Sequence, residues 1–236
     1  MNWAAIALAA RRAEAAYIED AAQAAAAFVT LGDIYVAQYQ NSDHQAVVSR
    51  DSAGDFHLSI SGTRFGQSLP DLFDDADIVP HDLGGGCEVS AGAYSGVGAL
   101  WEWAESLSPG SAAWHVGGHS LGGQRALLTG LFLPIEQIAS IVAFEAPKTG
   151  NAALWATLAP SLAKATCICN GEDMWFGWPL VSEWSHPPIA HIHLLPSDFE
   201  IIEPGMWPPA RDKDDHAIVM VTSRLEAIAT ATDHLV

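Results

Sequence analysis

The chain has 236 residues, of which half are hydrophobic and only 16% are charged, a composition that indicates a globular domain rather than a disordered chain. Its formal net charge is −18, and the ten lysines and arginines do not cluster except at Arg11–Arg12. An acidic surface repels polyanions, so this charge argues against binding to nucleic acid or to an anionic membrane face.

The cysteines and the N-terminal residues limit which cofactors, membrane segments and locations we expect. The three cysteines form neither an even disulfide framework nor a zinc-binding spacing, and Cys167 and Cys169 alternate in an apolar run, which predicts buried free thiols. We expect no metal and no cofactor. Residues 1–10 lack the basic region of a signal peptide, and no run of 18 apolar residues occurs. We therefore expect no membrane span, and a protein that is cytoplasmic or released without a recognisable signal peptide.

The first sixty residues predict helices followed by a small meander. An alanine-rich stretch over residues 3–29 favours one or two helices, and segments rich in β-branched and aromatic residues at 33–39, 45–49 and 56–61 favour strands. Their short connections force an antiparallel meander. We expect residues 1–236 to form a single domain, with 1–30 as an N-terminal helical segment packed on it.

After an irregular stretch over residues 62–90, strands and helices alternate. Strands are predicted at 112–116, 138–145, 164–169 and 189–195, and helices at 93–107, 124–133, 151–158 and 217–230. This alternation predicts right-handed crossovers and a mixed, mostly parallel sheet covered by helices on both faces. Catalytic groups would lie at the carboxyl ends of its strands.

The stretch Gly118-His119-Ser120-Leu121-Gly122 has the pattern of a sharp turn from a strand into a helix with serine at its apex. A bare Gly-x-Ser-x-Gly also occurs by chance, and the alternative is a structural glycine-rich turn. The apolar strand before it and the helix-forming sequence after it favour a nucleophilic serine.

A nucleophilic serine needs a histidine as base and an acid that orients it. Asp173 follows the predicted strand 164–169 through a turn, and His216 lies in a polar loop directly before the last helix. Both positions suit the order serine, acid, histidine. Glu172 and Asp198 are the alternative acids.

Four other histidines are alternatives to His216. His119 adjoins the serine, where neighbouring side chains diverge. His186 lies in a loop that we expect to line the cleft. His191 and His193 alternate on one strand face, as metal ligands would, although half-buried strand residues do so as well. An oxyanion hole would combine Thr63, at the end of the third strand, with the backbone N–H of Leu121, unless Ser61-Gly62-Thr63 is an ordinary turn.

Taken together, these motifs resemble the class 3 lipase family, a fungal-lipase-like branch of the α/β-hydrolases, from about residue 30 to residue 225. The similar segments are Ser61-Gly62-Thr63, Val89-Ser90-Ala91-Gly92-Ala93-Tyr94, Gly118-His119-Ser120-Leu121-Gly122, Phe144-Glu145-Ala146-Pro147-Lys148-Thr149-Gly150-Asn151, Asn170-Gly171-Glu172-Asp173-Met174 and Asp215-His216.

The resemblance implies a three-layer α/β-hydrolase sandwich in which Ser120 is the nucleophile, Asp173 the acid and His216 the base. It also implies an oxyanion hole at Thr63 and Leu121. The sequence departs from the family pattern at four positions, with Ser90 for histidine, Glu145 for glycine, Lys148 for arginine and Met174 near a usual valine. The departures leave the three catalytic candidates unchanged.

The resemblance implies ester hydrolysis through an acyl-enzyme, with a lipid or small-molecule ester as substrate and transient contact with a lipid interface. Residues 64–80 would form a lid or a fixed rim. Phe65, Trp175 and Trp178 are candidates for the acyl pocket, with core packing as the alternative for the tryptophans. Two other functions stay open, namely acyl transfer or amide hydrolysis on the same triad, and a non-catalytic binding domain.

Overall fold

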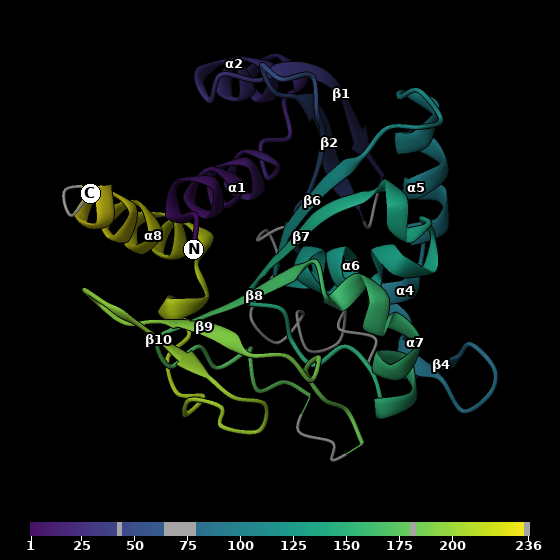
Figure 1. Ribbon diagram of the computed structural model, residues 1–236, viewed down its shortest axis with the longest axis vertical. Coiled ribbons are helices and arrows are strands. Elements are labelled where there is room, and N and C mark those ends of the chain that lie inside the picture. The colour runs from purple at the N-terminus through teal and green to yellow at the C-terminus, as the bar shows by residue number, and fades with distance from the viewer. Residues whose placement is uncertain (42–43, 64–78, 180–182, 234–236) are drawn as a thin grey trace.

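Eight strands form one mixed sheet at the centre of the computed structural model, which describes residues 1–41, 44–63, 79–179 and 183–233 (Figure 1). Along the sheet the strands are β1 (Ile34–Gln40), β2 (Gln45–Arg50), β3 (Phe56–Ile60), β6 (Trp114–His119), β7 (Ile138–Phe144), β8 (Ala165–Asn170), β9 (His191–Leu194) and β10 (Phe199–Ile202).

Strand direction follows the length of the connections. The short turns make β1, β2 and β3 an antiparallel meander, whereas β3, β6, β7, β8 and β9 run parallel. Helices lie in the connections from β3 to β8, and the described residues that join β8 to β9 contain no helix. The predicted mixed, mostly parallel sheet is therefore confirmed. Two additions were not predicted: the antiparallel edge strand β10, and a hairpin of β4 (Pro80–Asp82) and β5 (Glu88–Ser90) inside the stretch expected to be irregular.

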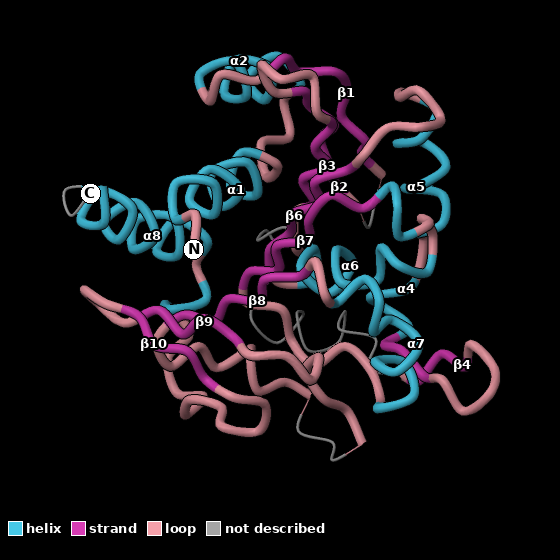
Figure 2. Tube along the Cα trace, viewed as in Figure 1, coloured by secondary structure: helices cyan, strands magenta, loops and turns pink. Residues whose placement is uncertain are grey.

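Helices cover both faces of the sheet. On one face lie α1 (Trp3–Ala15) and α8 (Ile218–Asp233), and on the other lie α4 (Ala91–Tyr94), α5 (Val97–Ser106), α6 (Leu121–Leu127) and α7 (Ala152–Leu162) (Figures 1 and 2). The short helix α2 (Ala21–Thr30) packs beside β1. None of the described helices is long and apolar enough to cross a membrane.

A separate apolar core fills each side of the sheet. Val116 and Ile141 pack toward α5 and α7, with Trp101 and Trp155 among their fully buried neighbours. Phe144, Ile168 and Ile192 pack on the other side against α1 and α8. The N-terminal helix α1 is therefore an integral part of the second core. Cys167 and Cys169 are buried free thiols, as predicted.

The helix predicted over residues 93–107 is divided into α4 and α5. Gly96 lies between them with a φ of 71°, a left-handed conformation that glycine adopts at little cost. A Cβ at this position would also collide with the ring of His44. The break therefore depends on a close contact with a distant segment, which helical propensity does not reveal.

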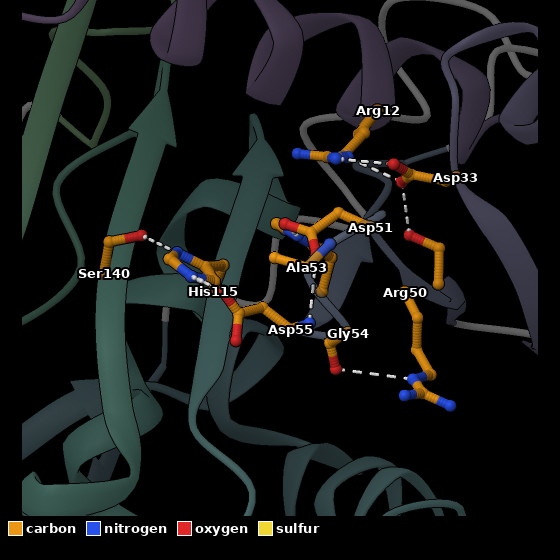
Figure 3. A network of polar contacts seen from close by, with 11 residues as sticks. Arg12, Asp33, Arg50, Asp51, Ala53, Gly54, Asp55, His115 and Ser140 are labelled. Atoms are coloured by element: carbon orange, nitrogen blue, oxygen red, sulfur yellow. Dashed lines mark hydrogen bonds and ion pairs between the residues drawn. The ribbon is translucent and has the colours of Figure 1, made fainter.

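A buried ion pair joins α1 to the start of the meander (Figure 3). Arg12 donates to both carboxylate oxygens of Asp33, at 2.7 and 2.6 Å, and Ser49 Oγ donates to Asp33 at 2.7 Å. Arg12 is 7% exposed and Asp33 is 5% exposed. Removing one partner of such a pair leaves the other charge buried and uncompensated.

We expect Arg12→Ala to lower the free energy of unfolding by about 3–5 kcal/mol. Arg11→Ala on the same helix is the matched control, because Arg11 pairs with Glu226 at the surface, where an ion pair contributes at most about 1 kcal/mol. Urea unfolding followed by circular dichroism measures both variants. Equal losses for Arg11→Ala and Arg12→Ala would contradict the expectation.

Candidate active site

Ser120 lies at the turn where β6 ends and α6 begins. Its φ is 57°, one of two positive values found for described residues other than glycine. Such a conformation costs a residue with a Cβ about 1–3 kcal/mol and persists only where its surroundings enforce it. The turn is held by two backbone hydrogen bonds, from Ser120 N to Phe144 O at 2.9 Å and from Gln124 N to Ser120 O at 3.1 Å.

Glycines on both sides of the serine allow this turn to exist. A Cβ on Gly118 would collide with the carbonyl of Gly122, and a Cβ on Gly122 would collide with the backbone of β3 at Ile60. Helix α6 therefore packs directly on the end of β3, closer than a side chain would permit. This contact explains the two glycines of the Gly-x-Ser-x-Gly pattern.

The structure brings Ser120, His216 and Asp173 into one chain of hydrogen bonds. His216 Nε2 lies 2.9 Å from Ser120 Oγ, and His216 Nδ1 lies 2.8 Å from Asp173 Oδ2. The acid can only accept, so Nδ1 carries the proton and Nε2 is free to accept the serine hydroxyl. All three residues are at least 92% buried. The arrangement has the geometry needed to activate a serine hydroxyl.

Asp173 stays ionised within this buried setting. Burial raises the pKa of its carboxyl, but the neighbouring Glu145 side chain, the hydrogen bond from His216 and the charge of a protonated His216 outweigh burial, so the pKa lies below its usual value. The backbone N–H of Trp175 also donates to Asp173 Oδ1 at 2.9 Å. The acid is therefore fixed in position by donors on both of its oxygens.

Two loops that are distant in sequence hold the base against the acid. The amide of Asn170 donates to the carbonyl of Asp215 at 2.6 Å, and the N–H of Glu172 donates to the Asp215 carboxylate at 2.9 Å. Arg224 on α8 pairs with Asp215 at 2.9 Å and donates to Asn170 at 2.6 Å. The end of β8 and the start of α8 are thereby joined directly beside His216.

His119 and Tyr17 form a second chain of hydrogen bonds below the serine. His119 Nε2 lies 2.8 Å from the carbonyl of His216, so this nitrogen carries the ring proton. Its Nδ1 then accepts from the Tyr17 hydroxyl at 2.6 Å, and Tyr17 accepts from the N–H of Gly62 at 2.8 Å. Burial, reinforced by His216, lowers the pKa of His119 to about 3, so His119 is neutral and structural.

The segment proposed for the oxyanion hole lies beside the serine. A Cβ on Gly62 would lie only 2.8 Å from Ser120 Cβ, so the chain leaving β3 passes directly over the nucleophile. Thr63 follows at once and is partly exposed. Leu121 is the first residue of α6, where backbone N–H groups have no partner within the helix. Both predicted donors are thus at the mouth of the site.

This geometry coincides with a family match. A family model described as lipase (class 3) matches residues 58–180, which is more than half of the chain. The chain belongs to the class 3 lipase family. It is therefore a carboxylic-ester hydrolase of the lipase and esterase type.

Solved structures of fungal lipases share the fold of this class 3 lipase. A lipase from Rhizopus microsporus var. chinensis aligns with a TM-score of 0.70 and 18% identity, over 91% of this chain and 85% of that chain. A mono- and diacylglycerol lipase from Aspergillus oryzae aligns with a TM-score of 0.72 and 16% identity, over 92% and 95% of the two chains. The predicted α/β-hydrolase fold is thereby confirmed. The sequence has no significant match among curated proteins.

The alternative acids and histidines of the lipase have other roles. Glu172 and Asp198 are exposed, and Asp198 accepts from the N–H of Phe199. His193 bridges Glu200 and the carbonyl of Gly171. We expect from the sequence that His186 lines the cleft. In the structure it is instead 3% exposed and stacks on Phe176, so it packs in the interior. His191 packs in the same aromatic cluster, where burial lowers its pKa to about 4.

The predicted pocket residues are only partly placed. Trp175 is buried and its ring centroid lies 6.2 Å from that of His216, so it packs beside the triad. Trp178 is half-buried, and its carbonyl accepts from the N–H of Lys148 at 2.7 Å. Phe65, like most of the predicted lid at 64–80, lies outside the described residues.

Sequence reasoning missed two residues of the site, Tyr17 and Glu145. Tyr17 follows a helix that looks like an appended segment. Glu145 was noted only as a departure from the family glycine, yet it is fully buried with a φ of 50°, and Oε2 lies 3.9 Å from His216 Nδ1. The signal in the sequence was an acid at a position where the family has glycine.

A cavity of about 660 Å³ lies elsewhere, between α1 and the sheet, and is lined partly by His57 and His115. These histidines belong to the first half of β3 and of β6, whereas Ser120 follows the end of β6 (Figure 3 shows His115). Catalytic groups of parallel sheets gather at the carboxyl ends of the strands. The cavity is therefore not part of the site around Ser120.

Proposed function

We propose that this lipase hydrolyses carboxylic esters through an acyl-enzyme formed on Ser120. The observation that carries the proposal is the unbroken chain from Ser120 Oγ through His216 to Asp173, at 2.9 and 2.8 Å. In the first step the serine oxygen attacks the ester carbonyl while His216 Nε2 takes the hydroxyl proton. Asp173 stabilises the imidazolium that results.

The backbone N–H groups of Thr63 and Leu121 then hold the negative oxygen of the tetrahedral intermediate. Collapse of this intermediate expels the alcohol, which leaves with the proton from Nε2, and an acyl group stays on Ser120. Water then attacks the acyl group and gives a proton to His216. Collapse of the second tetrahedral intermediate releases the carboxylic acid, and His216 returns the proton to Ser120. Donors fixed before the reaction make this stabilisation effective, because they need no reorganisation.

The substrate is proposed to be a lipid or small-molecule ester, with transient contact at a lipid interface. Trp175 lies beside His216 and offers an apolar wall to the acyl chain, and we assign Trp178 and Phe65 to the same pocket. A series of nitrophenyl esters of increasing chain length, below and above the solubility limit, measures acyl preference and interfacial response. Adding an alcohol acceptor distinguishes acyl transfer from hydrolysis.

Labelling with a fluorophosphonate tests the nucleophile directly. Wild type is expected to form one covalent adduct at Ser120, located by peptide mass spectrometry, and Ser120→Ala is expected to form none. Circular dichroism checks that both proteins are folded. A folded wild type that does not react with the probe would refute the proposal.

A further inference from the structure

We propose that Glu145 is a neutral carboxylic acid that donates a hydrogen bond to Asp173 and thereby positions this carboxylate against His216. The inference rests on the proposed function, because it concerns the acid of the same triad. It assigns Glu145 as a positioning residue that acts through Asp173 and does not touch the substrate.

The position of Glu145 in the sheet places its side chain among the triad. Strand β7 lies between β6, which leads to Ser120, and β8, which leads to Asp173, and Glu145 directly follows β7. A carboxyl oxygen of Glu145, a carboxyl oxygen of Asp173 and a ring nitrogen of His216 all lie within 4.8 Å of one another. The backbone N–H of Glu145 donates to the carbonyl of Ile168 at 2.8 Å, which holds the main chain from which the side chain projects.

No charge balances Glu145 in this position. It is fully buried, and neither carboxyl oxygen accepts a hydrogen bond from a described group. His216 Nδ1 is 3.9 Å away, but this nitrogen already donates to Asp173 at 2.8 Å. Two carboxylates this close in a buried setting cannot both stay ionised, so they share a proton.

The proton resides on Glu145 because of how the two acids are surrounded. Burial raises the pKa of Glu145 well above its usual value, and the charge of Asp173 raises it further, as do Cys169 and Asp215. Asp173 instead receives hydrogen bonds from His216 and from the N–H of Trp175. As a protonated acid, Glu145 has an O–H donor, and the neighbouring Asp173 carboxylate can accept it.

A divalent cation among the same three groups is the alternative. A cation would require His216 Nδ1 as an unprotonated ligand, whereas Nε2 must accept from Ser120 and Nδ1 must therefore carry the proton. The hydrogen bond between the acids needs no added ion. Unchanged activity after treatment with a chelator is expected, and its loss would favour the cation.

Two variants of similar size separate the neutral acid from an ionised one. Glutamine is always neutral and can donate an N–H to Asp173, so Glu145→Gln is expected to keep kcat/KM within about threefold, with the acidic limb of its pH profile within about 0.2 unit of wild type. Leucine cannot donate. Asp173 then presents its full charge to His216 and also binds protons more readily, and both effects move the acidic limb of Glu145→Leu to higher pH.

We expect this shift to be about half a pH unit or more, with kcat/KM lowered about tenfold. If Glu145 were ionised, both variants would remove a negative charge 3.9 Å from His216 Nδ1, and both acidic limbs would move to lower pH. If Glu145 only filled space, both variants would keep the wild-type profile. Either result overturns the proposal.

An infrared measurement keeps the test independent of activity and of the folding of Glu145→Leu. At neutral pH, wild type is expected to show the C=O stretching band of a protonated carboxylic acid, and Glu145→Gln is expected to lack it. An absence of this band in wild type would refute the neutral acid. Because the band does not depend on turnover, it decides the state of Glu145 even if Ser120 is not the nucleophile.

Discussion

Replacing His216 with alanine is expected to lower kcat for ester hydrolysis by about 10⁴-fold or more. His216 Nε2 lies 2.9 Å from Ser120 Oγ. In the proposed mechanism this nitrogen takes the serine proton and returns a proton to the leaving alcohol. One substitution therefore removes the proton transfers of both half-reactions. Steady-state rates with a soluble nitrophenyl ester measure the loss, and His81→Ala, at an exposed histidine, is the control.

The same mechanism predicts that the residues of the triad act as a unit. Ser120→Ala should lower kcat about as far as His216→Ala, and the double variant should be no slower than either, because each change alone already closes the acyl-enzyme route. The remaining rate would come from substrate binding and the oxyanion donors. Losses that multiply in the double variant would show that Ser120 and His216 contribute separately.

Gly122→Ala is expected to destabilise the fold strongly. The new methyl group would collide with the backbone of β3 at Ile60 and Ser61, and backbone atoms cannot move aside as a flexible side chain can. We expect unfolding free energy to fall by about 3 kcal/mol or more. In any folded fraction, displacement of Ser120 from His216 should lower kcat/KM about a hundredfold.

Gly117→Ala provides a matched control in β6, the strand that leads into the turn at Ser120. A Cβ on Gly117 would meet its nearest neighbours at 3.9 Å, which is ordinary van der Waals contact. This variant should therefore lie within about 1 kcal/mol of wild type, and both its stability and its kcat/KM should be retained. Thermal unfolding and kinetics of the two variants test whether the turn at Ser120 depends on close backbone contact rather than on flexibility.

The parts of the site that were predictable are those encoded in local sequence. Ser120 has a glycine pattern between a strand and a helix, and Asp173 and His216 each lie where a loop meets a regular element. Their order along the chain then placed them at one edge of a parallel sheet. The alternation of strands and helices likewise predicted the sheet and the helices on its two faces.

The parts that were not predictable depend on contacts between distant segments. Tyr17 lies 102 residues from His119, and nothing in its neighbours indicates that its hydroxyl reaches the site. In the sequence, Glu145 looks like the last residue of a strand. Only the order of the strands in the sheet brings it between Ser120 and Asp173. Strand β10 carries Glu200 in a short segment, and only its pairing with β9 makes it a strand.

The Tyr17 hydroxyl has a consequence for how this enzyme can be recombined. It accepts a hydrogen bond from the Gly62 N–H and donates one to His119, whose other ring nitrogen donates to the carbonyl of His216. Tyr17, in the N-terminal segment, therefore links the segment after β3, which includes Gly62, to the loop that carries His216. In chimeras with fungal lipases of the same fold, residues 17, 62 and 119 must therefore be exchanged together. Exchanging residues 1–17 alone should therefore displace the segment after β3 and the loop of His216 relative to each other, and lower the hydrolase activity of whatever fraction folds.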